Sequence, residues 1–425
     1  MDDVLREAFQ RMERATLERR EVLRLMGFAA AASAGLPTIL QYARAQDTVA
    51  AASQVIRGKS DVLIVHNDRT GVMETPLEEL RKNAITPKEI LYMRNNQILE
   101  PQGRSLDPVP LEGWSITLGG LVAFPRTIDA STLADLPQTE AEMVLQCSGN
   151  GRSFYARAVM TRGTQWAHGG MGNVVFSGVK LSDLLDTFDP PLDPRPEALF
   201  VTAEGADGPP EGASHPDFEH SLPVDDVLER AILATHMNGE PLPGAHGGPV
   251  RLVIPGYYGT MNIKWLSRLY FVTMQTNNVN PIPRYRVPQD PIQPGSPIDY
   301  TFENSEPSWR QRVKSAIFAP LDGETVNGPV ELRGVAWNDG TVPVSMVQVS
   351  TDEGKTWTAA AVDVPSSTYA WHHFSAQLQL PAGDHRIWVR AIDDLGRSPP
   401  LQGTVRWNPS GYEWNGADVI TVTVS

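Results

Sequence analysis

The sequence predicts an α+β protein in which a mixed α/β domain is followed by an all-β sandwich of the immunoglobulin type. Between residues 114 and 274, short apolar runs of strand length alternate with segments that have helical periodicity. Beyond residue 310, strand-like runs recur at intervals marked by turn residues, which is the pattern of a sandwich. Seven prolines between residues 281 and 307 separate the two patterns and indicate a semi-rigid crossing.

The first 45 residues predict an export signal. Arg19 and Arg20 precede an uncharged run over 25–43, and Ala43 and Ala45 supply the small residues of a cleavage site. This segment resembles a bacterial twin-arginine (Tat) signal peptide, a route used by proteins that fold around a cofactor before export. The alternative is a membrane anchor, which needs about 20 apolar residues, whereas the stretch 25–40 is shorter and contains Pro37. We therefore expect cleavage near Ala45, a periplasmic mature chain and no membrane attachment afterwards.

The mature chain divides into three parts. Residues 46–110 predict a polar N-terminal arm with one helix over 76–84, and residues 60–110 contribute to the next domain. The mixed α/β domain spans 111–308, with strands expected at 115–122, 143–147, 174–176, 198–202, 250–254 and 269–274 and helices at 181–188 and 224–234. The sandwich spans 309–425, with strands expected at 330–337, 344–350, 357–362, 370–380, 385–392 and 419–424. The turn residues Asp-Glu-Gly-Lys at 352–355 predict a tight hairpin between two of these strands.

The charge balance and the single cysteine exclude several classes of function. Lys and Arg total 36 against 50 Asp and Glu, and this net charge of −14 argues against a protein that binds nucleic-acid phosphates. Because Cys147 is the only cysteine, an intramolecular disulfide, a cysteine-based zinc site, an iron–sulfur cluster and a covalently attached c-type haem are excluded. The sequence also lacks an H-E-x-x-H metal motif, a nucleophile elbow and a nucleotide-binding glycine fingerprint.

The residues around Cys147 indicate a site that could bind a metal or an oxyanion. An apolar strand ends at this cysteine, small residues that leave backbone N–H groups accessible follow it, and Arg152 comes five positions later. Such a thiolate suits a thiophilic metal, and an arginine can bind an oxyanion through its planar fork of donors. The alternatives are a buried, inert cysteine and a solvated surface arginine.

Several runs together carry a family resemblance. They are Tyr-Met-Arg-Asn-Asn at 92–96, Cys-Ser-Gly-Asn-Gly-Arg-Ser at 147–153, Gly-Glu-Pro-Leu-Pro at 239–243, His-Gly-Gly-Pro-Val-Arg at 246–251 and Ile-Lys-Trp-Leu at 263–266. Their order and spacing resemble the sulfite oxidase family of molybdopterin enzymes, over roughly residues 60–425. The C-terminal sandwich, including the run at 350–357, resembles the dimerisation domain of that family.

The resemblance implies a site. Cys147 corresponds to the one protein ligand of molybdenum in a molybdenum–molybdopterin cofactor, Arg94, Arg152 and Arg162 to a cationic sulfite pocket, and Tyr285 to the active-site tyrosine. The residues expected to contact the cofactor are Tyr92, Arg94, Asn96, Cys147, Asp207, His246, Arg251, Asn262 and Lys264. Asn96 stands where the family has histidine, and Ser410 stands where many members carry arginine, so the substrate pocket is expected to be less positive.

The implied activity is oxidation of sulfite to sulfate. The chain carries no haem segment, so the electrons are expected to pass to an external acceptor, a c-type cytochrome, and the sandwich implies a homodimer. Two alternatives stay open at this point: a molybdopterin-dependent reductase of a sulfoxide or another oxo-anion, and a non-catalytic exported binding module.

Overall fold

The computed structural model describes residues 50–208 and 218–425. The predicted export signal over 1–45 lies outside the described residues. Among the helices that are described, none is both long and apolar enough to cross a membrane.

The arm packs around an apolar cluster made of its own residues and of Ala245. It contains the helix α3 (Ala52–Val55), the hairpin of β1 (Ile64–Asn67) and β2 (Val72–Glu74), and the single helical turn α4 (Leu77–Leu80). Met73 and Met93 exchange two backbone hydrogen bonds of 2.9 Å, which fix the segment that carries Arg94. The helix predicted over 76–84 is shorter than expected, because the residues that follow Leu80 are exposed and give a second turn nothing to bury.

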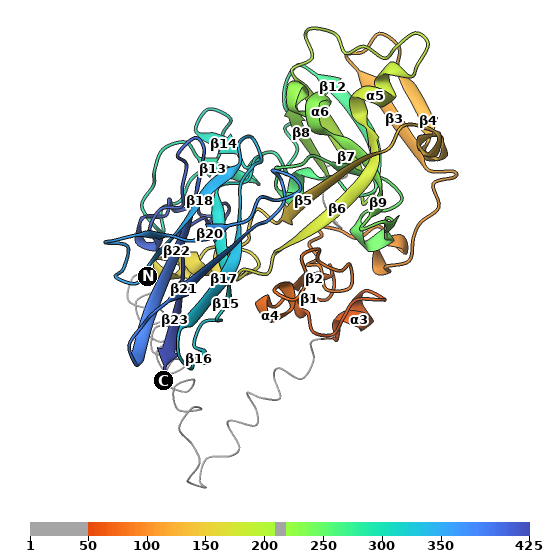
Figure 1. Ribbon diagram of the computed structural model, residues 1–425. Helices are drawn as coiled ribbons and strands as arrows, with labels where there is room; N and C mark the ends of the chain where they lie inside the picture. Colours follow the sequence, from red (N-terminus) through yellow and green to blue (C-terminus); the bar gives the residue numbers. More distant parts are fainter. Residues whose placement is uncertain (1–49, 209–217) are drawn as a thin grey trace, which may run out of the picture. The chain divides into compact units, whose positions relative to one another are not determined.

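Two five-stranded sheets follow the arm (Figure 1). One has the order β10-β9-β6-β5 with β11 paired to β9, from β5 (Thr139–Gln146), β6 (Met171–Lys180), β9 (Ile232–Met237), β10 (Glu240–Pro241) and β11 (Arg251–Val253). The other has the order β4-β3-β12-β7-β8, from β3 (Ser115–Gly120), β4 (Arg126–Asp129), β7 (Phe200–Gly205), β8 (Glu219–Pro223) and β12 (Leu266–Val272). Residues of both sheets and of the helices α5 (Leu181–Asp186) and α6 (Val224–Arg230) form one apolar core.

One helix prediction is wrong in its extent. The expected helix over 224–234 ends at Arg230, and the chain continues into β9. The apolar residues after Arg230 pair on both sides, with β6 and β11, and are buried in the sheet. A continuous apolar run has no periodicity that distinguishes a buried strand from a buried helix.

The C-terminal part is a sandwich of two sheets that share a core. One sheet contains β15 (Lys314–Ala319), β17 (Val330–Trp337), β21 (His372–Leu378) and β20 (Ala361–Val362). The other contains β16 (Thr325–Val326), β23 (Asp418–Val424), β22 (Gly383–Asp393), β18 (Val344–Ser350) and β19 (Thr358–Ala359). The predicted strand over 357–362 is divided between the two sheets, and the predicted hairpin is confirmed by the pairing of β18 with β19. A short ladder of β13 (Arg286–Pro288) and β14 (Ser305–Pro307) lies in the proline-rich segment.

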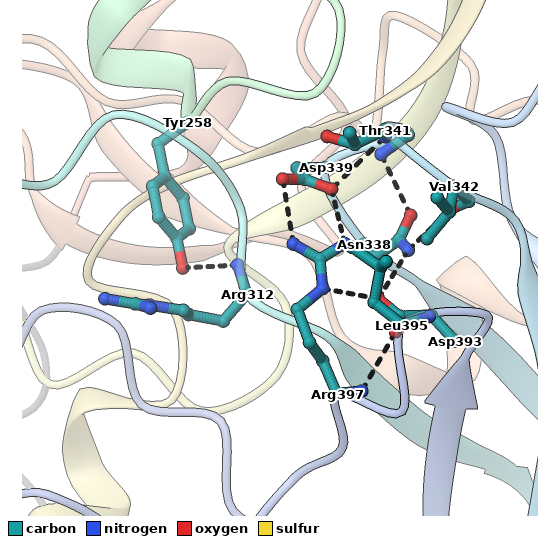
Figure 2. Close-up of polar contacts among 10 residues, drawn as sticks. Tyr258, Arg312, Asn338, Asp339, Thr341, Val342, Asp393, Leu395 and Arg397 are labelled. Carbon is teal, nitrogen blue, oxygen red and sulfur yellow. Dashed lines mark hydrogen bonds and ion pairs between the residues drawn. The ribbon is translucent and has the colours of Figure 1, made fainter.

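Buried polar contacts hold the sandwich against the strand that leads to Cys147. Trp337 donates its indole N–H to the Gln146 Oε1 at 2.7 Å, and the Gln311 amide donates to the Val144 carbonyl at 2.8 Å. Figure 2 shows a second polar cluster, in which Arg397 donates to the carboxylates of Asp339 and Asp393. The Asp339 carbonyl lies so close to Gly256 that a Cβ there would approach it to 2.1 Å. The contacts to Gln146 and Val144 therefore position the strand that leads to Cys147.

Candidate functional site

A pocket collects the predicted site residues at the carboxyl end of β5. Among the residues that line it are Tyr92, Arg94, Asn96, Cys147, Asp207, His246, Arg251, Asn262, Lys264 and Tyr285. These side chains come from the arm, the loop after β5, the segment after β7, the loops around β11 and the proline-rich segment, so they are distant in sequence. The structure thus brings together ten of the twelve residues singled out from the sequence, leaving out Arg152 and Arg162.

Cys147 lies directly after β5 and is 5% exposed, with a free thiol. Its backbone N–H donates to the Gly170 carbonyl at 2.8 Å, and its own carbonyl accepts from Asn150 at 2.9 Å, which closes a turn. Gly151 continues the turn with a φ of 89°. In the described part of the chain no three His, Cys, Asp or Glu side chains are grouped to hold a metal ion. A metal at Cys147 would therefore need further donors from a bound group.

Buried positive groups line another part of the pocket. Burial lowers the pKa of Lys264 well below its ordinary value, and the neighbouring Arg251 adds to this effect. Burial also lowers the pKa of Arg251, to about 10. It lowers the pKa of His246 as well, and the positive charge of Lys59 lowers it further. Asp207 raises the pKa of Lys264 and offsets part of the shift. A concentration of cationic groups out of water costs free energy unless an anion compensates it.

Backbone contacts fix these groups in place. Arg251 donates to the carbonyls of Asn262 and His246, each at 3.1 Å. Lys264 donates to the Asn95 side chain and to the Ala245 carbonyl. At Gly259, which lines the pocket, a Cβ would lie 2.6 Å from the Tyr92 hydroxyl, so the absence of a side chain there lets Tyr92 pack against the backbone. These donors and the single thiol fit a phosphate-bearing cofactor that brings its own metal ligands.

Arg94, Asn96 and Tyr285 form a connected polar group in the same pocket. The Arg94 Nη2 donates to the Asn96 Oδ1 at 2.8 Å, and the Asn96 Nδ2 donates to the Tyr285 hydroxyl at 3.2 Å. Tyr285 adopts a φ of 51° and stacks on Tyr412 with a ring separation of 5.1 Å. Because the Tyr285 oxygen accepts from Asn96, its own O–H is available to a bound anion.

Arg152 lies behind this group and does not line the pocket. It is 6% exposed, donates to the carbonyls of Ser410 and Thr164 at 2.9 and 2.8 Å, and lies over the Tyr412 ring at 5.3 Å. Its guanidinium fills the space beside Gly149, where a Cβ would lie 2.5 Å from Nη2. Arg162 lies on the segment after Arg152 and is exposed. It does not line the pocket, so its predicted place in the sulfite pocket is not supported.

Three residues that shape the site were not anticipated from the sequence. Lys59 contacts His246, Asn95 accepts from Lys264, and Tyr412 stacks on Tyr285. The run at 92–96 includes Asn95, so its motif gave a usable signal, whereas Lys59 and Tyr412 lie outside every motif.

Comparison with known proteins identifies the family and the fold. A model of the oxidoreductase molybdopterin binding domain matches residues 106–280, and a model of the Mo-co oxidoreductase dimerisation domain matches residues 306–419. Mitochondrial sulfite oxidase of Homo sapiens is 32% identical over 378 residues, which cover 85% of this chain and 66% of the human protein. The chain belongs to the sulfite oxidase family. Within this family of molybdopterin oxidoreductases, sulfite oxidase of Arabidopsis thaliana is 28% identical over 80% of this chain and 88% of the plant protein.

A solved structure has the same fold. The sulfane dehydrogenase SoxCD of Paracoccus pantotrophus superposes with a TM-score of 0.68 at 24% identity, covering 94% of this chain and 96% of the other. The expected α+β fold of this family is thereby confirmed. The chain spans 63% of the length of the Macaca fascicularis sulfite oxidase and 66% of the human enzyme, so less than two thirds of either.

Proposed function

We propose that this chain oxidises sulfite to sulfate with a molybdenum–molybdopterin cofactor held by Cys147. The observation that carries the proposal is the pocket that combines the Cys147 thiol, the buried cations and the Arg94–Asn96–Tyr285 group. The sulfite oxidases among the relatives support the substrate class. Overall, sulfite and water become sulfate, two protons and two electrons.

The cofactor, when bound, supplies a two-electron acceptor and the oxygen atom that sulfite gains. The residues Arg251, Lys264 and His246, which line the pocket, would hold its phosphate, and the Cys147 thiolate would bind its metal. Arg94 offsets the negative charge of sulfite, and the Tyr285 hydroxyl donates a hydrogen bond to one of its oxygens. Both donors are fixed before the substrate arrives, so little reorganisation accompanies binding.

Arg152 serves as a support for the tyrosine in this scheme. Its guanidinium is tied to the backbone at Ser410 and Thr164 and packs against Tyr412, which stacks on Tyr285. The cation therefore adds positive potential behind the pocket without direct contact with the anion.

The partners and the location form part of the same proposal. The electrons leave to an external acceptor, for which a c-type cytochrome with a basic face suits the net charge of −14. The chain forms a homodimer through its dimerisation domain, a state that sedimentation at working concentration can refute. It is exported by the twin-arginine route and processed near Ala45, which the mass of the secreted chain tests.

The decisive assay is sulfite-dependent reduction of ferricyanide by the molybdenum-loaded protein, because a small acceptor removes the unknown partner. We expect rapid reduction that is lost in Cys147→Ser and retained in Lys82→Met, which alters a lysine whose side chain is 57% exposed. If the loaded protein reduces no ferricyanide with sulfite but oxidises a reduced dye with a sulfoxide, the reaction runs in the opposite direction and the proposal fails.

A further inference from the structure

Lys59 is a buried lysine that neither the motifs nor the pocket lining assigns to the site. It follows the short helix α3 in the arm and is 3% exposed. Its ammonium group lies 2.5 Å from the Lys88 carbonyl, 2.7 Å from the Leu91 carbonyl and 3.0 Å from the Nε2 of His246. A fully buried lysine is rare without a partner charge.

The charges near Lys59 are mostly of its own sign. Burial lowers its pKa, and Glu89 is the acidic residue that partly offsets this shift. Lys59 in turn lowers the pKa of His246 and of Lys264. Such an arrangement is unfavourable in the cofactor-free chain and becomes favourable when a phosphate dianion binds next to it.

The contact with His246 also fixes the imidazole. A protonated Lys59 has three N–H donors and no acceptor, so in that state it donates to the Nε2 at 3.0 Å, which accepts. Nε2 lies farther, 3.3 Å, from the Lys88 carbonyl, which the ammonium already engages. The imidazole proton is therefore on Nδ1, which has no hydrogen-bond partner among the described residues, and His246 lines the pocket.

We infer that Lys59 is a positioning residue of the cofactor-phosphate site, acting through His246: it holds the imidazole as an Nδ1–H donor and adds positive charge behind it. The inference rests on the cofactor of the proposed function and not on its substrate. Lys59 thereby ties the N-terminal arm to cofactor retention.

Release of the cofactor from the loaded protein tests this role. Pterin fluorescence in the filtrate is followed over time for the wild type, Lys59→Met and the matched control Lys82→Met, in the absence of sulfite. We expect about 10-fold to 100-fold faster release from Lys59→Met, the usual effect of removing a group that orients a ligand-binding side chain, and wild-type release from the control.

A second readout separates positioning from general stability. Thermal midpoints are measured for the loaded protein and for protein produced in cells that cannot make molybdopterin. We expect Lys59→Met to lower the midpoint of the loaded form more than that of the cofactor-free form. Equal falls in both forms, or release at the wild-type rate, overturn the inference. If Lys59→Met does not fold, Lys59→Gln, which keeps N–H donors without the charge, is judged by the same two results.

Since sulfite is absent throughout, a failure of the substrate assignment leaves this test valid. A wild type that retains cofactor yet does not oxidise sulfite refutes the proposed reaction alone. Release rates that are insensitive to Lys59 refute the positioning role alone.

Discussion

Replacement of Asn96 is a direct test of how the substrate end of the pocket is arranged. The Asn96 amide bridges two groups: its oxygen accepts from Arg94 at 2.8 Å, and its nitrogen donates to the Tyr285 hydroxyl at 3.2 Å. Because Arg94 can only donate, Asn96 must turn its Oδ1 toward Arg94, which leaves its Nδ2 to donate to Tyr285. The tyrosine proton is consequently directed away from Asn96 and toward the anion.

The size of the effect follows from these two hydrogen bonds. A bond to a charged donor contributes about 1.5–3 kcal/mol and a neutral one about 0.5–1.5 kcal/mol. If about half of that total is expressed in the transition state, Asn96→Ala lowers kcat/KM for sulfite by roughly 5-fold to 50-fold. Asn96→Asp keeps the acceptor for Arg94, loses the donor to Tyr285 and adds a negative charge, so we expect a larger loss. Asn96→His, which can donate, should recover part of the activity.

The assay is steady-state ferricyanide reduction over a range of sulfite concentrations and pH values. Loss should be concentrated in KM for Asn96→Asp, where charge repels the anion, and shared with kcat for Asn96→Ala. Asn67→Ala, an exposed asparagine on β1 outside the pocket lining, is the matched control and should match the wild type. Equal kinetics for Asn96→Asp and the wild type would refute the bridging role.

Three further predictions concern stability and geometry. Burial lowers the pKa of His220 to about 3, so the folded chain keeps this histidine neutral, and stability is lost as pH falls from 6.5 toward 3. In urea unfolding, the wild type should lose on the order of 3 kcal/mol between pH 7 and pH 4 through this histidine, and His220→Phe should not show that loss. Asp226 accepts a hydrogen bond from the Tyr257 hydroxyl, and its two oxygens lie 2.5 and 2.7 Å from the Arg310 Nη2. We therefore expect Asp226→Asn to cost about 2 kcal/mol in the same assay at pH 7. Gly149→Ala displaces the Arg152 guanidinium and should lower kcat/KM by about ten-fold without loss of molybdenum.

The sequence predicted the site better than it predicted the ends of the elements. The residues of the motifs at 92–96, 246–251 and 263–266 meet in one pocket. The second and third motifs lead into β11 and β12, and the first is held beside β2 by the bridge between Met73 and Met93. Element ends depended on partners that the sequence does not display. The run after Arg230 became a strand because β6 and β11 flank it, and the strand at 357–362 divides because its halves pair in different sheets.

Contacts between distant residues could not be predicted. Lys59 lies 187 positions before His246, in a polar arm without periodicity, so neither its burial nor its partner follows from local pattern. Arg152, by contrast, lies in a motif that the sequence shows, but the direction in which its side chain points does not follow from that motif. The glycines beside its guanidinium, Gly149 and Gly163, leave a space away from the pocket that only the folded loops create.

The central claim is that the Cys147 pocket holds a molybdenum cofactor that sulfite reduces. Anaerobic titration of the loaded protein with sulfite, followed by its visible absorption, tests this without any acceptor or partner. We predict that one equivalent of sulfite reduces the centre in the wild type, and that Cys147→Ser shows no such change at equal pterin content. An unchanged spectrum in the wild type, or the same change in both proteins, would contradict the account.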